Sequence, residues 1–305
     1  MNAVDLFSGA GGFSEGARLA GVHVVAAANH WPAAVACHTA NHPETVHYCQ
    51  DLHQIDWSQI PAHDLLLASP ACQGHSRARG KDRAHHDGSR ATAWAVVSCL
   101  EAHRPELGLI ENVPEFLEWS LYPAWLLAVR LLGYSVSSHV INAADHGVPQ
   151  ARARVFLVLA RSLAPLRLRL PQEAHVPVSS LIDWTGGTWS PVVRPRRAAA
   201  TLRQWRAGRR ERGERFLIPY YGSHRRDART RSIDRPLGTV TTRARYAVVD
   251  GDRMRMLTVA ENRAAMGFPD SYQLPTDRKL AIHLLGNAVC PPVARDLILA
   301  MRRAA

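Results

Sequence analysis

The sequence predicts an α/β protein built on a doubly wound, mostly parallel sheet, with a second, smaller domain. Three observations lead to this prediction. Short apolar, β-branched segments alternate with helix-like stretches as far as residue 160, a glycine-rich turn follows the first of these segments, and the alternation ends where proline and arginine become frequent. Strands and helices in alternation are typical of a parallel sheet with helices on both faces.

The expected strands and helices follow one another regularly along the chain. Each strand is a short apolar segment, and a longer helix-like stretch separates most of the strands. The helix that we expect to end near residue 132 is followed by Gly133, a residue that commonly terminates helices. Strands are expected over residues 4–8, 22–29, 64–69, 107–113, 134–141 and 155–160, and helices over 13–20, 32–40, 90–103 and 120–132.

A change of composition divides the chain near residue 161. There the alternation gives way to proline, arginine and turn residues, as in "RSLAPLRLRLPQEAHVPVSSL", and from about residue 280 the sequence is typical of a loop followed by an amphipathic helix. A chain of 305 residues also exceeds the usual size of one domain. We therefore expect a large domain over 1–165, a small domain over 166–278, and a C-terminal helix over 279–305 that returns to the large domain.

The net charge favours a polyanionic partner. It is +11, and because Lys81 and Lys279 are the only lysines, nearly all of the positive charge is arginine. Arginine side chains match phosphates and base edges, and the phosphates that they neutralise release condensed counterions. An arginine-rich proteome would give the same composition, so the charge alone does not decide for nucleic acid.

The apolar runs and the cysteine content indicate in which cellular compartment the protein works. Every apolar run is shorter than the ~20 residues needed to span a bilayer, so we expect neither a membrane span nor a secretory signal. The five cysteines are scattered and odd in number, which indicates a reducing cytoplasm. One cluster combines cysteine and histidine, but its spacing matches no usual zinc pattern, so we expect structural or surface roles and no metal. Its members are Cys37, His38, His42, His47 and Cys49.

The first strand ends in a glycine-rich turn, "DLFSGAGGFSEG", over residues 5–16. Glycines there allow a tight backbone turn and the close approach of a nucleotide-like ligand. A dinucleotide fold would require a third glycine at position 14 and an acidic residue after the second strand, but the chain has Ser14 and Asn29-His30-Trp31. The turn therefore favours a cofactor and argues against a nicotinamide dinucleotide.

Chemically active side chains follow several of the expected strands. Cys72 comes just after the third clear strand, Glu111 ends the next one, and Arg152 and Arg154 lie in "GVPQARARVFLV". Ligands of open α/β sheets bind beyond the carboxyl ends of the strands, so these groups should converge on one edge of the sheet. Cys72 alone would be either a nucleophile or a small buried thiol.

Six motifs in register across almost the whole chain resemble those of the cytosine-5 DNA methyltransferases of bacterial or phage type. Five of them are similar to the family's cofactor turn, nucleophile motif, catalytic glutamate motif, Q-x-R-x-R motif and final motif, and "RPLGTVTTRARY" with "LTVAENRAAMGFPD" resembles the motif before the last helix. The first five are the turn 5–16, Cys72-Gln73, Glu111-Asn112-Val113, Gln150 with Arg152 and Arg154, and "GNAV" over 286–289.

The resemblance implies a Rossmann-like methyltransferase sheet with a small target-recognition domain, and a defined chemistry. Cys72 would add to carbon 6 of a cytosine flipped out of the duplex, so that carbon 5 can attack the methyl group of S-adenosylmethionine. Glu111 would hold or protonate ring nitrogen 3, and Arg152 and Arg154 would anchor the pyrimidine oxygen and a neighbouring phosphate.

The resemblance also implies a set of cofactor-binding residues. His75 replaces an aromatic residue found in many relatives, and two further departures from the family pattern lie in or beside this set. His30 replaces the usual acidic partner of the ribose, and Ala71 replaces the proline that usually precedes the cysteine. The expected cofactor-binding residues are Phe7, Ser8, Gly9, Gly11, Gly12, His30, Trp31, Asp51, Leu52, Pro70, Asn287 and Val289.

The DNA contacts implied by the resemblance come from the loop after the nucleophile and from the small domain. Because that domain is short, we expect a short target site. The expected DNA-binding residues are Gln73, Ser76, Arg77, Arg79, Gln150, Arg209, Arg210, Arg225, Arg226, Thr241 and Thr242.

Three readings of the function remain open at this point: cytosine-5 methylation of double-stranded DNA, the same chemistry on RNA of the tRNA type, and a DNA-binding relic without activity. The presence of Cys72, Glu111 and both arginines argues against the relic, and Ser14 and His30 argue against a nicotinamide-dependent oxidoreductase. We expect a cytoplasmic, nucleoid-associated monomer, with a cognate restriction enzyme, a phage genome or a regulatory role as alternative settings.

Overall fold

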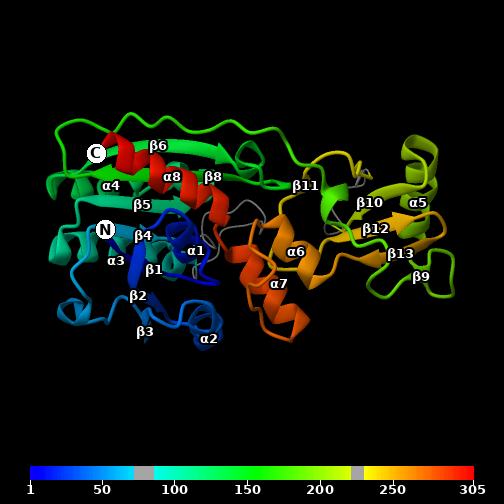
Figure 1. The fold of residues 1–305 in the computed structure, drawn as a ribbon, viewed down its shortest axis with the longest axis horizontal. Helices are drawn as coiled ribbons and strands as arrows, with labels where there is room; N and C mark the ends of the chain where they lie inside the picture. Colours follow the sequence, from blue (N-terminus) through cyan, green and yellow to red (C-terminus); the bar gives the residue numbers. More distant parts are fainter. Residues whose placement is uncertain (72–85, 221–229) are drawn as a thin grey trace.

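The computed structural model describes residues 1–71, 86–220 and 230–305, with side chains for all of these except 86–91. Its centre is a seven-stranded sheet in the order β3-β2-β1-β4-β5-β8-β6, with helices on both faces (Figure 1). The predicted α/β class is therefore confirmed. The strands are β1 (Asn2–Leu6), β2 (His23–Asn29), β3 (Val46–Cys49), β4 (Leu65–Ala68), β5 (Leu107–Asn112), β6 (Ser135–Asn142) and β8 (Ala153–Ala160).

The direction of β8 determines which residues meet at the functional edge of the sheet. Strands β1 to β5 are parallel to one another, whereas β8 pairs antiparallel with both β5 and β6. Asn112 at the end of β5 is paired with Val155 near the beginning of β8. Because β8 runs the opposite way, its first residues lie at the same edge as the carboxyl ends of β4 and β5.

Successive residues of the strands point to opposite faces of the sheet. Leu65 and Leu67 belong to a buried cluster with Phe13 and Leu297, whereas Leu66 belongs to a second cluster with residues of α3 and α4. Both faces are therefore covered, as in doubly wound folds. The helices of this part are α1 (Gly12–Leu19), α2 (Pro32–Asn41), α3 (His86–His103), α4 (Tyr122–Leu131) and α8 (Pro291–Ala304), and the short 3-10 helices are η1 (Trp57–Gln59), η3 (Pro114–Glu118) and η4 (Ala143–His146).

Strand β3 is part of the central sheet, but the sequence did not predict it. Its four residues, Val-His-Tyr-Cys, are exposed or half-buried at the edge of the sheet, so they show no apolar pattern. The strand forms because its backbone pairs with β2, from Val46 opposite Ala26 to Cys49 opposite Asn29.

Helix α7 (Arg278–Asn287) lies in a segment that was expected to be a loop. The Asp277 carboxylate accepts a hydrogen bond from the Leu280 N–H at 2.7 Å and caps the helix, and Leu284 and Leu285 are buried. The stretch 278–304 would be long and apolar enough to cross a membrane, but 78% of its apolar window is buried inside the fold.

The second part of the chain contains a four-stranded antiparallel sheet in the order β10-β12-β13-β9, at the end of the molecule away from both termini (Figure 1). Helix α5 packs on this sheet, with Gly208 directly against the Phe216 ring. The elements are β9 (Ser190–Pro191), β10 (Arg215–Pro219), β12 (Tyr246–Asp250), β13 (Arg253–Met256), α5 (Ala199–Arg212), α6 (Val259–Ala265), η5 (Val178–Leu181), and the parallel pair β7 (Gln150–Ala151) and β11 (Leu237–Gly238).

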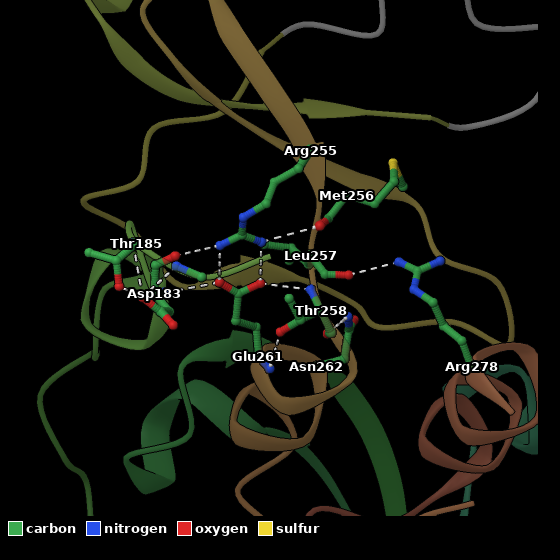
Figure 2. Close-up of polar contacts among 10 residues, drawn as sticks. Asp183, Thr185, Arg255, Met256, Leu257, Thr258, Glu261, Asn262 and Arg278 are labelled. Atoms are coloured by element: carbon green, nitrogen blue, oxygen red, sulfur yellow. Dashed lines mark hydrogen bonds and ion pairs between the residues drawn. The ribbon is translucent and has the colours of Figure 1, made fainter. Parts of the chain in front are cut away.

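A buried ion pair joins the small sheet to helix α6 (Figure 2). The Arg255 guanidinium donates to both carboxylate oxygens of Glu261, at 2.6 and 2.8 Å, and to the Asp183 carbonyl at 2.7 Å. Glu261 also accepts from the Thr258 N–H, closing a capping box at the start of α6. Arg278 at the start of α7 donates to the Leu257 carbonyl. The small sheet, α6 and α7 are thus held together by a hydrogen-bonded network.

Removing one partner of this pair should cost much more stability than removing both. We expect Glu261→Ala to lower the free energy of unfolding by about 4 kcal/mol, because it leaves the Arg255 charge buried and unpaired. The double variant Arg255→Met with Glu261→Leu should lose less than half as much. Urea unfolding followed by circular dichroism measures both, and a double variant as unstable as Glu261→Ala would contradict the expectation.

Candidate active site

The glycine turn after β1 needs its glycines for two reasons. Gly9 and Gly11 have φ of 55° and 81°, in the left-handed region that favours glycine. Gly12, the first residue of α1, lies so close to the C-terminal part of the chain that a Cβ atom there would be 2.1 Å from the Val289 carbonyl oxygen. The turn is therefore fixed both by its own backbone and by the segment between α7 and α8.

A cavity of about 370 Å³ opens beside this turn, at the carboxyl edge of the sheet. Its size suits a nucleoside-sized ligand. The Trp31 ring contacts the His283 ring edge-on, with centroids 5.2 Å apart, and so joins the end of β2 to α7. The lining residues are Phe7, Gly9, Asn29, His30, Trp31, Ser69, Pro70, Ala71, Glu111, His283, Leu284 and Asn287.

The structure brings half of the expected cofactor residues together in this cavity: Phe7, Gly9, His30, Trp31, Pro70 and Asn287. The other six do not line it. Asp51 is exposed, with a carboxylate that accepts from the His53 N–H, and Leu52 is buried in the core. Ser8, Gly11, Gly12 and Val289 instead shape the turn and the chain packed against it.

The side chains that line the cavity fit an adenosine-type methyl donor. Trp31 and Phe7 offer flat apolar faces for a purine, and Glu111 is the one acidic residue among the described residues that line the cavity. Asn29 and the imidazoles of His30 and His283 also line the cavity, and their side chains can accept hydrogen bonds from hydroxyl groups. Sequence reasoning missed His283, because α7 was expected to be a loop, and it missed Asn29 and Ser69, which carry no motif signal.

Glu111 and Arg154 form the charged centre of this edge. The Arg154 Nε lies 3.1 Å from the Glu111 Oε1, and both side chains are largely buried. Burial raises the pKa of the Glu111 carboxyl, and the positive charges of Arg154 and Arg152 act against this rise. Glu111 is therefore a carboxyl group that can hold a proton at a higher pH than an exposed glutamate.

The Cys72 segment begins at the same edge. Cys72 and Gln73 lie outside the described residues, but Ala71, which precedes Cys72, lines the cavity that contains Glu111. The Asn112 side chain donates to the Pro70 carbonyl at 3.2 Å, and the Ala71 N–H donates to the Thr92 hydroxyl at 3.1 Å. These bonds fix the end of β4 beside the end of β5.

Arg152 and Gln150 have a different environment from the one expected. Arg152 is buried and donates to the carbonyls of Val240, Gly286 and Ala288 at 2.9 to 3.0 Å, so it stabilises the scaffold instead of presenting its guanidinium to a base. Gln150 is fully buried and bonded to Val240 and Ala265, so it cannot reach a duplex in this conformation.

The remaining DNA candidates fall into three groups. Arg209 is paired with Glu214 and Asp252, whereas Arg210 on the same helix is exposed. Thr241 and Thr242 are half-buried, in backbone contact with Gly286. The others lie outside the described residues: Ser76, Arg77, Arg79, Arg225 and Arg226.

No group of His, Cys, Asp and Glu side chains within residues 1–71, 92–220 and 230–305 is arranged to hold a metal ion.

Comparison with known proteins identifies the family of the chain. The sequence pattern of the family described as C-5 cytosine-specific DNA methylase matches residues 1–184 and 184–303. The chain is 29% identical over 329 residues to the Type II methyltransferase M.NlaX of Neisseria lactamica, covering 99% of this chain and 96% of that protein. It is 27% identical over 321 residues to the Type II methyltransferase M1.HphI of Haemophilus parahaemolyticus, covering 97% and 85%.

Solved structures share the fold at lower identity. The methyltransferase EhMeth of Entamoeba histolytica has a TM-score of 0.71 at 18% identity, over 99% of this chain and 98% of that chain. The S. pombe Dnmt2 methyltransferase has a TM-score of 0.70 at 18% identity, over 100% and 99%. The solved structures show the fold, and the sequence pattern that matches nearly the whole chain defines the class of the protein as a methyltransferase. The chain belongs to the C-5 cytosine-specific DNA methylase family and is a DNA cytosine-5 methyltransferase, with Type II restriction-modification enzymes among its relatives.

The contact of Gly12 with Val289 gives a test of the turn. We expect Gly12→Ala to cost about 2 kcal/mol of folding free energy, because its Cβ would overlap a backbone carbonyl that cannot move away alone. Gly133→Ala is the control: its Cβ would meet open space, so only the backbone strain of a φ of 91° remains, about 1 kcal/mol. Chemical denaturation compares the two, and equal losses would argue against a tight contact at Gly12.

Proposed function

We propose that this enzyme transfers a methyl group from S-adenosylmethionine to carbon 5 of a cytosine within a short site of double-stranded DNA. The observation that supports this most directly is the single cavity shared by Trp31, Glu111 and Ala71, the residue before Cys72. A purine face, a carboxyl group of raised pKa and the start of the nucleophile segment therefore meet at one edge of the sheet.

In this proposal Cys72 is the nucleophile. Its thiolate adds to carbon 6 of the cytosine, and Glu111 donates a proton or hydrogen bond to ring nitrogen 3, which offsets the charge that develops there. S-adenosylmethionine, when bound, supplies an electrophilic methyl group for carbon 5. A base then removes the proton from carbon 5, and the Cys72 thiolate leaves.

Arg154 and Arg152 take separate roles. Arg154, which contacts Glu111 and is partly accessible, orients that carboxyl group and anchors the pyrimidine oxygen or a phosphate. Arg152 donates to the carbonyls of Val240, Gly286 and Ala288, and it thereby holds the segments that carry them in place. The buried Gln150 likewise supports the segment that carries both arginines.

The methyl donor would lie with its adenine near Trp31 and its ribose near His30. We infer a retained but moderate affinity, because a neutral imidazole offers one acceptor to the two ribose hydroxyls where relatives offer a carboxylate. Asn29, His283 and Asn287 line the same cavity and can supply further hydrogen bonds. Asp51 is exposed two residues after β3 and does not line the cavity, so no contact with the adenine is assigned to it.

The DNA duplex would lie against the small sheet. Reaching carbon 6 requires the cytosine to leave the base stack, and basic side chains such as the exposed Arg210 would neutralise phosphates during that step.

We propose that the chain is divided into domains over 1–165, 166–278 and 279–305. We also propose that the protein is a cytoplasmic monomer of bacterial or phage origin, and that a restriction enzyme is its partner in a restriction-modification pair.

Replacing Cys72 tests the nucleophile. Cys72→Ala should abolish methyl transfer, because no thiolate remains to activate carbon 5, while the DNA affinity should change little. The measurement is incorporation of labelled methyl groups into duplex DNA and, in parallel, into tRNA. A rate near that of the unaltered enzyme would refute the covalent mechanism, and labelling of tRNA alone would shift the substrate to RNA.

The Glu111–Arg154 contact predicts a pH effect. If protonated Glu111 is the reactive form, activity falls as the pH rises through its raised pKa. Arg154→Gln removes a positive charge that lowers this pKa, so the alkaline fall of kcat/KM should move to higher pH, although the rate itself drops. Arg154→Lys keeps the charge and serves as the control. An alkaline limb that stays in place in Arg154→Gln would contradict this role of Glu111.

A further inference from the structure

The cofactor turn rests on a cluster of buried polar side chains that methyl transfer, as described above, does not use. A Cβ atom on Gly11 would lie 2.4 Å from the Tyr272 hydroxyl and about 3.1 Å from the His38 ring, and the Tyr272 hydroxyl donates to the Ala10 carbonyl at 2.5 Å. The cluster therefore packs directly against the backbone of the turn. Its members come from β1, α1, α2, β3 and the segment after α6: Asp5, Ser14, His38, His42, His47 and Tyr272.

Four of these side chains form a continuous hydrogen-bonded path. The Ser14 hydroxyl donates to the Asp5 Oδ2 at 2.7 Å, the His38 Nε2 lies 2.9 Å from the Ser14 Oγ, and the His38 Nδ1 lies 2.8 Å from the His47 Nε2. Asp5, Ser14 and His38 are fully buried, whereas His47 is half-buried on the edge strand β3. The path thus leads from the interior under the turn to the surface.

Asp5 is the unusual group at the inner end of this path. Its Oδ1 meets no hydrogen-bond donor among the described residues, and its neighbours on β2 and β4 are Ala27 and Leu67. Burial without a cationic partner disfavours the carboxylate, and it raises the pKa of Asp5 from 3.8 to about 7. Neutral and ionised Asp5 are therefore both populated near neutral pH.

The hydrogen bonds of this path can form whether Asp5 is ionised or protonated. When Asp5 is ionised, Ser14 donates to it, His38 donates from Nε2 to Ser14, and His47 donates from Nε2 to the His38 Nδ1. When Asp5 is protonated, each of these bonds reverses, because hydroxyl and imidazole groups act as donor and acceptor. Burial and the neighbouring imidazoles lower the pKa of His38, which keeps its ring neutral and able to do both.

The other ionisable groups around the cluster leave Asp5 as the group that changes charge. Glu15 and Arg18 form an ion pair with each other at 2.7 Å. Burial lowers the pKa of His42, so that ring is neutral, and burial holds the pKa of Tyr272 well above its usual range, so its hydroxyl stays protonated.

We propose that Asp5 is a charge-selecting residue for the cofactor: its ionised form, reached by passing a proton through Ser14 and His38 to His47, favours the cationic methyl donor over the demethylated product. This inference rests on the proposed cofactor. S-adenosylmethionine carries a sulfonium charge that its product, S-adenosylhomocysteine, lacks. Asp5 lies on β1, two residues before the cavity residue Phe7, and its partner Ser14 lies in the first turn of α1, directly after the glycine turn. A charged group bound in the cavity would therefore act on the Asp5 carboxyl through the protein interior, where charges are screened less than in water.

The proton balance is closed. The Asp5 proton moves to the Ser14 Oγ, the Ser14 proton to the His38 Nε2, and the proton on the His38 Nδ1 to the His47 Nε2. His47, which is half-exposed, then loses one proton to solvent. One proton leaves the protein, and Asp5 gains one negative charge within the cluster that packs against the glycine turn.

Calorimetric titration in two buffers of different ionisation enthalpy tests this inference. Near pH 7 the unaltered enzyme should release up to about half a proton on binding S-adenosylmethionine, and much less on binding S-adenosylhomocysteine, because Asp5 is then about half ionised. Asp5→Asn, an isostere of the neutral form, should release no such proton and should bind the donor about tenfold more weakly at pH 8, with unchanged affinity for the product. Equal proton release by both proteins would overturn the inference.

Two further variants separate this role from a structural one. The hydrogen bonds from Ser14 lower the pKa of Asp5, so Ser14→Ala should move the pH at which donor affinity rises to a higher value. Asp296→Asn changes another buried carboxyl, bonded to His146 far along the chain, and should leave the ratio of donor to product affinity unchanged. A shift in Asp296→Asn equal to that in Asp5→Asn would overturn the inference. If the unaltered enzyme bound no S-adenosylmethionine, the proposed cofactor and this inference would both fail.

Thermal unfolding without ligand checks that the Asp5→Asn variant is folded, and it also measures the effect of the raised pKa of Asp5 on stability. A carboxyl whose pKa is higher in the folded than in the unfolded state binds its proton more tightly when folded, so stability falls as the pH rises from about 4 to 7. Asp5→Asn should lack this part of the decline and melt at a higher temperature than the unaltered enzyme at pH 8. A lower melting temperature at that pH would contradict the state assigned to Asp5.

Discussion

The guanidinium of Arg152 is the point on which the active-site edge depends. It joins three carbonyls from distant parts of the chain, those of Val240, Gly286 and Ala288, while its own backbone pairs with the Asn142 side chain and the Ala143 N–H. Arg152 directly precedes β8, which runs antiparallel to its neighbours, so this joint forms beside Glu111 and not at the opposite end of the sheet. An arginine makes this junction possible because its planar fork supplies several donors in fixed directions. The catalytic edge, the segment that returns from the small sheet and the break between α7 and α8 are thus held by one side chain.

The central sheet could be read from the sequence because its strands are buried on both faces and therefore appear as uninterrupted apolar runs such as Leu65-Leu66-Leu67. Strand β3 escaped this reasoning, since an edge strand with half-buried polar residues is defined by backbone pairing and has no apolar signal. Helix α7 escaped it for another reason: its cap depends on Asp277, and its burial depends on contacts with segments far away in sequence. Of the cavity, the residues within motifs were found, whereas His283 belongs to it only because α7 is folded against Trp31.

The arginine content indicated a nucleic-acid partner, but it did not show which arginines are free to contact phosphates. Arg152 and Arg255 are buried and bind carbonyls or a carboxylate, and Arg209 and Arg215 are paired with acidic residues of the small sheet. These side chains have a structural role, so counting charges overestimates the surface available to phosphates. Sequence alone could not separate the two uses, because the acidic partners come from other strands. Similarly, the histidines near residue 40 form a cluster in the sequence whose spacing matches no usual zinc pattern. In the fold, His38 and His47 are instead connected to Asp5 through Ser14.

The contact between Gly12 and Val289 has a consequence for the synthesis of the protein. The first turn of the chain and one wall of the cavity, His283 to Asn287, are separated by nearly the whole sequence. Contacts of such separation form late, since the intervening chain must be ordered first. On the ribosome, the N-terminal turn emerges long before the helix that completes the cavity, so a nascent or prematurely terminated chain has no closed site for a methyl donor. Methyl transfer therefore requires that residues 283–289 have been synthesised and have packed against the first turn.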